Sequence, residues 1–232
     1  MTHECTEERF LRDVADHKMI VIRDEGVNRH IRFKESSTNN QYFDLITWPG
    51  HLCYTGDMGT YVFQRTEDMF SFFRTDRDYN RQRGRRIAIN PHYWTEKLIA
   101  VHGGRDGGKA MEYDEAQFRR VINQYRVDWM RGAKAEGLLD ADGRRALWEA
   151  VDDEVFGALE DGGVDRALWA AHEFSYRDGD STGSRDSWHF EELWEHRMKD
   201  YTFGMVWCLY ALAWGIEQYD MAKQPAAEAV PA

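Results

Sequence analysis

The chain has 232 residues, enough for one large domain or two small ones with a proper hydrophobic core. Hydrophobic residues make up 42% of it and aromatic residues 14%, a composition that excludes a disordered or fibrous protein. The formal net charge of −11 means that net charge alone will not draw the molecule to nucleic acid or to anionic lipid.

The first half of the chain is predicted to start with a short helix and to continue as an antiparallel sheet. Thr6 can cap the helix, and Phe10 and Val14 lie on its apolar face. About five strands follow, broken by turn residues such as Pro49-Gly50, and a meander is their natural order. The expected strands are Lys18–Arg23, Val27–Lys34, Gln41–Trp48, His51–Thr55 and Thr60–Gln64.

Two helices are expected after these strands. One, around Glu67–Phe73, carries aromatic residues that can pack against the sheet. The other begins at Asn90-Pro91, with Asn as the N-cap and Pro in the first turn. Its apolar face consists of Trp94, Leu98 and Val101. The glycine-rich run 103–108 follows and is a candidate domain boundary.

The second half of the chain is predicted to be helical. Asp114 and Gln117 fit a capping box for a helix that Gly137 ends. Another helix follows, up to Gly162-Gly163, and a shorter one carries Leu168. The last long helix is expected from about Trp188 to Tyr219. It contains sixteen uncharged residues, 201–216, which are too few and wrongly flanked for a membrane span and favour a buried core helix.

These patterns predict an α+β protein of two domains with opposite charge balance. We expect a sheet domain at 1–110, a helical domain at 111–222 and a flexible tail at 223–232. Residues 1–110 carry a formal charge of +1, whereas 111–232 carry −12. Three scattered cysteines cannot form a disulfide framework, and the acidic N-terminus contains no signal or transit peptide. We therefore expect a cytoplasmic protein.

A metal site is one candidate for function. If Trp188–Tyr219 is helical, His189, Glu192 and His196 fall at i, i+3 and i+7 and present two imidazoles and a carboxylate on one face. The alternative is an ordinary surface pair between Glu192 and His196. No fourth ligand is evident, and we predict no other cofactor.

A second candidate is a thiol site. His51 and Cys53 share one face of a strand and could act as a base and a nucleophile. No third group that would orient the base can be identified, and a half-buried cysteine in a strand is more typical of a core.

An arginine cluster is the third candidate. It combines six arginines with two aspartates, a balance of +4 over thirteen residues. Such a cluster can bind phosphates or an acidic protein surface, or it can be a solvated loop or an internal partner for the acidic second half. Its arginines are Arg74, Arg77, Arg81, Arg83, Arg85 and Arg86.

Acidic residues gather in the middle of the second half. On helices they could form a negative face that imitates a phosphate backbone and attracts proteins built to hold DNA or RNA. The alternative is a face that only promotes solubility. The residues are Asp140, Asp142, Asp152, Asp153, Glu154, Glu160, Asp161 and Asp165, and we assign Asp152, Asp153 and Glu154 to partner binding.

Several segments give the chain a resemblance that covers nearly its whole length. They are His3–Leu11, Ile22–Asp24, Arg29–Phe33, Phe43–Gly50, Leu52–Gly59, Asn90–Trp94 and Tyr210–Ile216. With them the chain resembles a family of phage and prophage accessory proteins of Gram-negative bacteria. The resemblance implies a role in takeover of the host, including the blocking of bacterial immune systems, and implies no catalytic residues.

Together these features predict a phage protein without enzymatic chemistry that binds and occludes a host macromolecule. We expect that partner to be a host protein or nucleoprotein complex of an antiviral system, and we expect no membrane association. The alternative is a nucleic-acid-binding protein that uses the arginine cluster and the aromatic residues of the sheet, with hydrolysis at the metal site as one version. A structural role in the virion is a third hypothesis.

Overall fold

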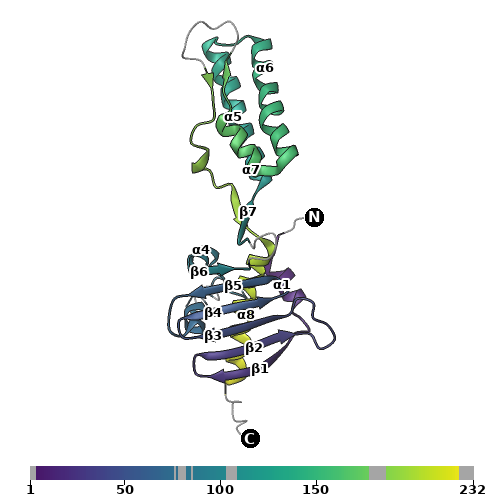
Figure 1. Ribbon diagram of the computed structural model, residues 1–232, viewed down its shortest axis with the longest axis vertical. Coiled ribbons are helices and arrows are strands. Elements are labelled where there is room, and N and C mark those ends of the chain that lie inside the picture. Colours follow the sequence, from purple (N-terminus) through teal and green to yellow (C-terminus); the bar gives the residue numbers. More distant parts are fainter. Residues whose placement is uncertain are drawn as a thin grey trace, which may run out of the picture. The chain divides into compact units, whose positions relative to one another are not determined.

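The chain folds into two compact units. The computed structural model describes residues 4–75, 77, 82–84, 86–102, 109–177 and 187–224. Unit 1 comprises Met1–Ala110 together with Tyr201–Ala232, and unit 2 comprises Met111–Asp200. The α+β class is confirmed, since an N-terminal antiparallel sheet with helices is followed by a helical half (Figure 1). The expected helical domain 111–222 is corrected in one respect, because the last helix belongs to unit 1.

Unit 1 contains a six-stranded meander in the order β1-β2-β3-β4-β5-β6, with antiparallel neighbours throughout. Pro49 and Gly50 are the two central residues of the turn between β3 and β4. Gly50 has φ of 79°, a positive value that glycine adopts readily at the second central position of a turn. The strands are β1 (Lys18–Glu25), β2 (Asn28–Lys34), β3 (Phe43–Trp48), β4 (His51–Gly56), β5 (Gly59–Gln64) and β6 (Leu98–Val101).

The four helices of unit 1 whose bounds the structure describes begin at side-chain caps. They are α1 (Glu7–Asp13), α2 (Met69–Arg74), α4 (Pro91–Thr95) and α8 (Phe203–Lys223), capped by Thr6, Asp68, Asn90 and Thr202. The helix expected from Asn90 through Val101 is therefore wrong in its second half. It ends at Thr95, and Leu98–Val101 pairs with β5 as the edge strand.

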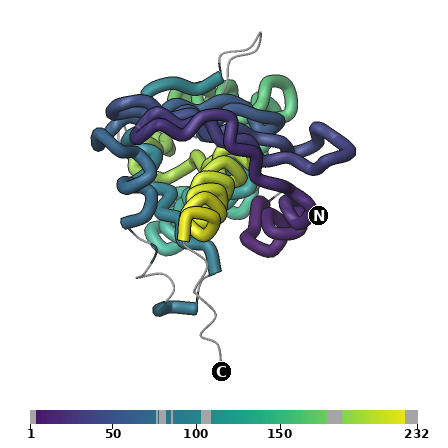
Figure 2. The backbone as a smooth tube through the Cα atoms, turned by 90° about the horizontal axis from the view of Figure 1, so that it is seen from below, coloured from purple at the N-terminus to yellow at the C-terminus, as the bar shows by residue number. Residues whose placement is uncertain are grey.

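The core of unit 1 lies between the sheet and α8. Apolar side chains from alternate positions of β2 to β5 point to the helix side, and α8 lies along that face (Figures 1 and 2). The Phe43 ring packs edge-on against Trp207 at 5.6 Å and stacks on Phe33 at 4.8 Å. Gly215 lets α8 approach closely, since a Cβ there would lie 2.9 Å from Leu45 Cδ1. The uncharged stretch of α8 is thus a core helix, and among the described residues no helix has the length and hydropathy that a membrane span needs.

Unit 2 is built on three helices with a π-helical turn. They are α5 (Glu115–Glu136), α6 (Ala141–Val151), the π-helical η1 (Asp152–Phe156) and α7 (Gly157–Glu173). As predicted, Asp114 caps α5 by accepting a hydrogen bond from the Gln117 amide, and Gly137 ends it in a left-handed conformation. Gly163 interrupts α7 with φ of 71° and ψ of −172°.

The segment before α8 is not helical, which corrects the helix expected from Trp188. Its buried residues, Phe190, Leu193 and Met198, pack into the core of unit 2 without helical spacing. Thr202 then caps α8, which begins at Phe203. The short elements of this part are β7 (Met111–Tyr113), β8 (Tyr176–Arg177), β9 (Ser187–Trp188), the 3₁₀ turn η2 (Leu193–Glu195) and β10 (Lys199–Tyr201), with β7 paired to β10 and β8 to β9.

Candidate functional site

The predicted metal ligands do not share a helix face. His189 Nε2 lies 2.9 Å from a carboxylate oxygen of Glu191, and His196 Nε2 lies 3.4 Å from the Tyr125 hydroxyl. Glu192 has φ of 52° at the start of η2, so this segment is not an α-helix. The i, i+3, i+7 spacing therefore does not place the three side chains on one face. Within the described ranges, no three His, Cys, Asp or Glu side chains gather in an arrangement that could hold a metal ion. The predicted metal site at His189, Glu192 and His196 is therefore wrong.

The thiol of Cys53 is not activated. It donates to the carbonyl of Tyr54 at 3.6 Å, whereas His51 Nδ1 lies 2.9 Å from the carbonyl of Pro49. Burial, with a smaller contribution from Asp44, raises the pKa of the Cys53 thiol. A thiolate nucleophile needs a lowered pKa instead, so the geometry does not support covalent catalysis here.

Two arginines of the cluster serve as internal partners within unit 1. Arg74 donates to both carboxylate oxygens of Asp220, at 2.9 and 2.6 Å, and Arg77 donates to one of them at 2.7 Å. Burial alone would raise the pKa of the Asp220 carboxyl, but the hydrogen bonds from both arginines outweigh it and the pKa is lowered. These contacts join Arg74 at the end of α2, and Arg77 three residues further on, to Asp220 of α8. Arg81 and Arg85 lie outside the described residues.

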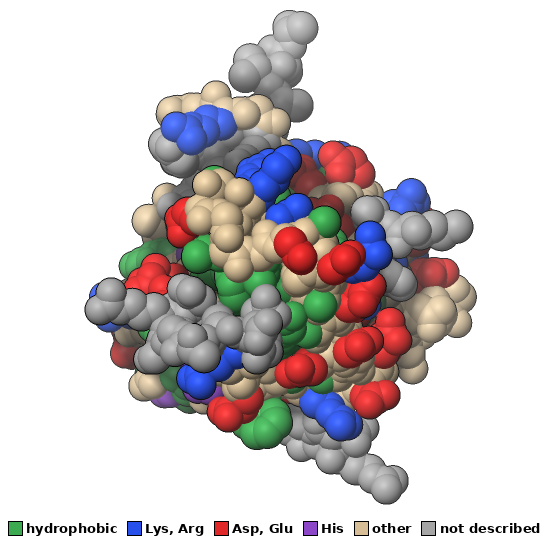
Figure 3. Space-filling view, turned by 90° about the horizontal axis from the view of Figure 1, so that it is seen from above, with side chains coloured by type: hydrophobic (Ala, Val, Ile, Leu, Met, Phe, Trp, Pro, Cys, Tyr) green, Lys and Arg blue, Asp and Glu red, His purple; other side chains and the backbone are tan. Residues whose placement is uncertain are grey.

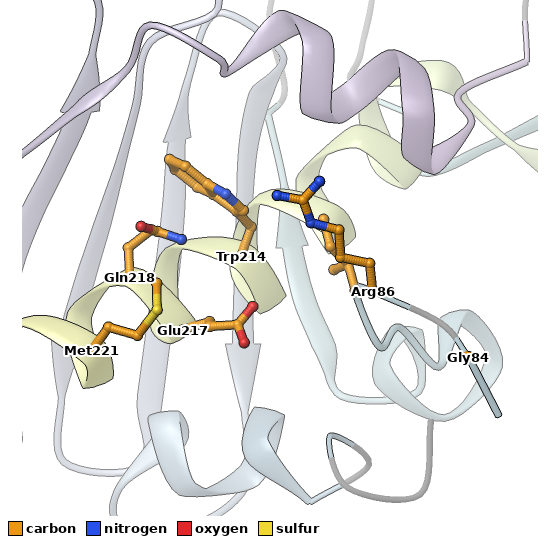
Figure 4. Close-up of a pocket in the computed structure, with 7 residues that line it drawn as sticks. Gly84, Arg86, Trp214, Glu217, Gln218 and Met221 are labelled. Atoms are coloured by element: carbon orange, nitrogen blue, oxygen red, sulfur yellow. The ribbon is translucent and has the colours of Figure 1, made fainter. Parts of the chain in front are cut away.

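Arg86 lines a hollow beside α8. Figure 4 shows its guanidinium on the side of Trp214, with Glu217, Gln218 and Met221 further along the same helix. The hollow has a volume of about 460 Å³. It combines one cationic and one anionic side chain and so gives no preference for phosphate or for an acidic partner.

Most aromatic residues of the sheet are buried and so cannot stack on bases. Those on the helix-covered face are buried, namely Phe33, Phe43, Tyr54, Tyr61 and Phe63. Trp48, at the end of β3, is exposed and stacks on the His51 ring at 5.0 Å. Stacking platforms for single-stranded nucleic acid need exposed rings on the binding face, so the sheet gives the nucleic-acid hypothesis little support.

The acidic residues assigned to partner binding divide into two kinds. Asp152 receives two hydrogen bonds from Arg126, at 2.9 and 2.8 Å, and so holds the fold of unit 2. Asp153 and Glu154 are exposed, and in the described part of the chain neither forms an ion pair. Asp140 caps α6 by accepting from the Gly143 amide at 2.8 Å.

Carboxylates cover much of unit 2. Residues 111–200 contain 12 Lys and Arg against 22 Asp and Glu, a formal charge of −10. Figure 3 shows acidic side chains gathered beside a band of hydrophobic ones. The exposed carboxylates on α5, α6, η1 and α7 are Glu115, Asp128, Glu136, Asp142, Glu149, Asp152, Asp153, Glu154, Glu160, Asp161, Asp165 and Glu173. Exposed carboxylates are therefore spread over all four of these helical elements.

Two tryptophans of unit 2 are largely exposed. The exposed fraction is 68% for Trp169 on α7 and 77% for Trp194 in η2. An indole left in water is unusual in a folded protein, and exposed Trp residues are enriched in the energetic centres of protein interfaces.

Trp194 borders an apolar groove of about 480 Å³ in unit 2. The apolar residues that line this groove, which we call the Trp194 groove, are Met111, Tyr113, Leu168, Leu193, Trp194 and Met198. The other lining residues are His172, His196, Arg197 and Lys199. His196 also lines a second hollow of about 420 Å³ along α5, which includes Val121 and Tyr125.

The sequence interpretation did not identify this groove. Trp169 could have been found, because it stands off the stripe of Val164, Ala167 and Ala171 that faces the core. Trp194 could not, because it lies in a segment without periodicity, and the groove brings it together with Met111 from the start of unit 2.

Comparisons of the chain with protein-family models, with curated proteins and with solved structures gave no match.

Proposed function

We propose that this protein acts by binding, and that its acidic unit 2 occupies a basic, nucleic-acid-binding surface of a host protein or nucleoprotein. The observation that carries the proposal is the set of exposed carboxylates on α5, α6, η1 and α7, within a unit of formal charge −10. In the phage context that the sequence resemblance implies, the partner belongs to an antiviral system of the bacterial host, and binding blocks it by occlusion.

Fixed carboxylates can compete with a phosphate backbone for the same basic surface. Helices hold their side chains at set spacings, and a dense field of one sign speeds the encounter with a surface of the opposite sign. The Arg126–Asp152 pair holds η1 and so positions its neighbours Asp153 and Glu154. Exposed Trp194 adds apolar contact area that a purely electrostatic surface lacks.

The test is capture by the full-length protein from a lysate of Gram-negative bacteria, followed by elution with duplex DNA. We expect proteins that normally bind nucleic acid to be retained at low salt and released by DNA, because DNA and unit 2 would occupy one site. The double variant Asp153→Asn/Glu154→Gln should lower this capture about threefold or more, since it removes two charges of the proposed face.

The matched control loses the same number of charges, but from unit 1 instead of unit 2. Asp16→Asn/Glu67→Gln removes two exposed carboxylates there and should leave capture unchanged. Equal loss in both variants, or retained proteins that DNA does not release, would contradict the proposal. Binding of duplex DNA by the protein itself would favour the nucleic-acid hypothesis instead.

A further inference from the structure

We propose that the Trp194 groove receives the apolar face of a basic amphipathic helix of a protein partner. This inference rests on the proposed function, because it names the chemistry of the partner that unit 2 would hold.

Six of the ten residues that line the groove are apolar. Leu193 and Met198 are buried, whereas Met111 and Trp194 are exposed to 38% and 77%. Each Å² of apolar surface removed from water stabilises a complex by about 25 cal/mol before the costs of association. Covering these two side chains would therefore favour binding.

The cations in the lining are already engaged. Arg197 lies 3.4 Å from the Asp200 carboxylate, and Lys199 Nζ lies 4.3 Å from the centre of the Tyr113 ring. Both cations therefore already have a partner within unit 2.

The carboxylates beside the groove favour a cationic partner. Glu192 and Glu195 adjoin the lining residues Leu193, Trp194 and His196 in sequence, are exposed, and form no ion pair with any residue that the structure describes. Their field reaches the second hollow, where burial and then Glu192, Glu191 and Glu195 raise the pKa of Tyr125. An apolar centre beside carboxylates is complementary to apolar side chains flanked by Lys or Arg.

The extent of the surface fits a helix better than a single side chain. The Trp194 groove and the second hollow adjoin at His196, which lines both. An amphipathic helix places apolar residues at i, i+3, i+4 and i+7, so that one face fills adjoining hollows while its charged residues stay at the edges.

The experiment uses three synthetic peptides of about 14 residues with the full-length protein, followed by fluorescence anisotropy of the labelled peptide. The first is an amphipathic helix of Leu and Lys, the second has Glu for each Lys, and the third has Ser for each Leu. We expect the Leu/Lys peptide to bind and the other two to bind about tenfold or more weakly, because each lacks one half of the complementarity.

Two variants test the position of binding, each with a matched control. Trp194→Ala and Met111→Lys should weaken binding of the Leu/Lys peptide about tenfold. Trp169→Ala removes an indole of similar exposure that does not line the groove, and Met221→Lys makes the same change on α8 of unit 1, so both should bind within about twofold of the unchanged protein. All four side chains are exposed, so the fold should tolerate the changes, and circular dichroism checks that it does.

Several outcomes would overturn the inference. They are no binding of the Leu/Lys peptide, equal binding of the Leu/Glu peptide, and equal effects of Trp194→Ala and Trp169→Ala. A dimer that Trp194→Ala dissociates, measured by light scattering, would show that a second copy of the chain covers the groove. If groove variants keep their capture from lysate while Asp153→Asn/Glu154→Gln loses it, the proposed function stands and only this inference fails.

Discussion

Arg126 and Asp152 form a two-pronged ion pair in which only one partner is buried. The guanidinium is 2% exposed and the carboxylate 48%, and their two hydrogen bonds measure 2.9 and 2.8 Å. Arg126 also donates to the carbonyl of Trp148 at 3.0 Å, and its guanidinium carbon lies 3.6 Å from the centre of that indole ring. The pair thus ties α5 to the junction of α6 and η1, beneath the acidic surface.

This asymmetry predicts unequal costs for removing the two partners. Asp152→Ala leaves a buried guanidinium without its carboxylate and should destabilise unit 2 by about 3 kcal/mol. Arg126→Met leaves a carboxylate that water can reach and should cost about 1 kcal/mol. Scanning calorimetry of both variants measures the difference.

The neighbouring carboxylate supplies the control for this prediction. Asp153→Ala removes the same group one residue later, where it is exposed and forms no ion pair with a described residue. Its melting temperature should stay close to that of the unchanged protein. A larger loss in Arg126→Met than in Asp152→Ala would show that the stacking of the guanidinium on Trp148 matters more than the pair.

The close approach of α8 to the sheet leads to a second prediction. A Cβ at Gly215 would lie 2.9 Å from Leu45 Cδ1 and 3.1 Å from the Phe33 ring. Gly215→Val should therefore destabilise unit 1 by about 1–3 kcal/mol through overpacking, measured by urea unfolding.

Gly132 on α5 provides a contrasting site. A Cβ there meets nothing within 4 Å, so Gly132→Ala should stabilise the helix by about 0.5–1 kcal/mol. If Gly215→Val were as stable as the unchanged protein, the sheet and α8 would have room that their side-chain distances do not show.

Local signals made much of the fold predictable. Asp114 caps α5 and Gly137 ends it, because both effects depend only on residues within one turn. The helix predicted over Leu98–Val101 was wrong. Trp94, Leu98 and Val101 at i, i+4 and i+7 suit a helix, whereas pairing with β5 selects a strand. The helix predicted for the segment before Phe203 was also wrong. Phe190, Leu193 and Met198 are buried by the tertiary fold although their spacing is not helical.

The candidate site was predictable only where it depends on composition. The negative surface of unit 2 follows from the number of carboxylates, since there are too many to bury. The role of Arg74 could not be predicted from composition, because its partner Asp220 lies 146 residues away in the sequence. The Trp194 groove likewise depends on bringing Met111 and Met198 together, which no local pattern indicates.

Acid should weaken unit 1 through carboxylates that bind cations. Burial alone would raise the pKa of the Asp44 carboxyl, but hydrogen bonds from Arg32 and His30 outweigh it and the pKa is lowered. The folded pKa then lies below the unfolded value of about 3.9, so the stabilisation is complete above that pH and is lost as the pH falls through the folded pKa. Melting temperature against pH should drop in this range.

The variant Asp44→Asn separates this effect from general acid unfolding. It should melt below the unchanged protein at pH 7, and the gap should narrow as the pH falls below about 4, because the unchanged protein then loses the same charge. Asp16→Asn, at an exposed position, should show no such gap. A constant gap between Asp44→Asn and the unchanged protein across the whole range would assign the effect to packing instead of ionisation.

The three cysteines should react slowly with alkylating reagents in the folded protein. Burial, with the nearby Asp13 carboxylate, raises the pKa of Cys5 to about 12, and burial raises those of Cys53 and Cys208. Because the thiolate is the reactive form and an ordinary thiol has a pKa of about 8.5, iodoacetamide at pH 8 should label the unfolded chain about 100-fold faster. Mass spectrometry of timed samples follows each site, and Cys53, which is only partly buried, should be labelled before Cys208. Rapid labelling of Cys53 in the folded protein, with a midpoint below pH 8, would instead reveal an activated thiol and restore the nucleophile hypothesis that its contacts with Tyr54 and Asp44 now argue against.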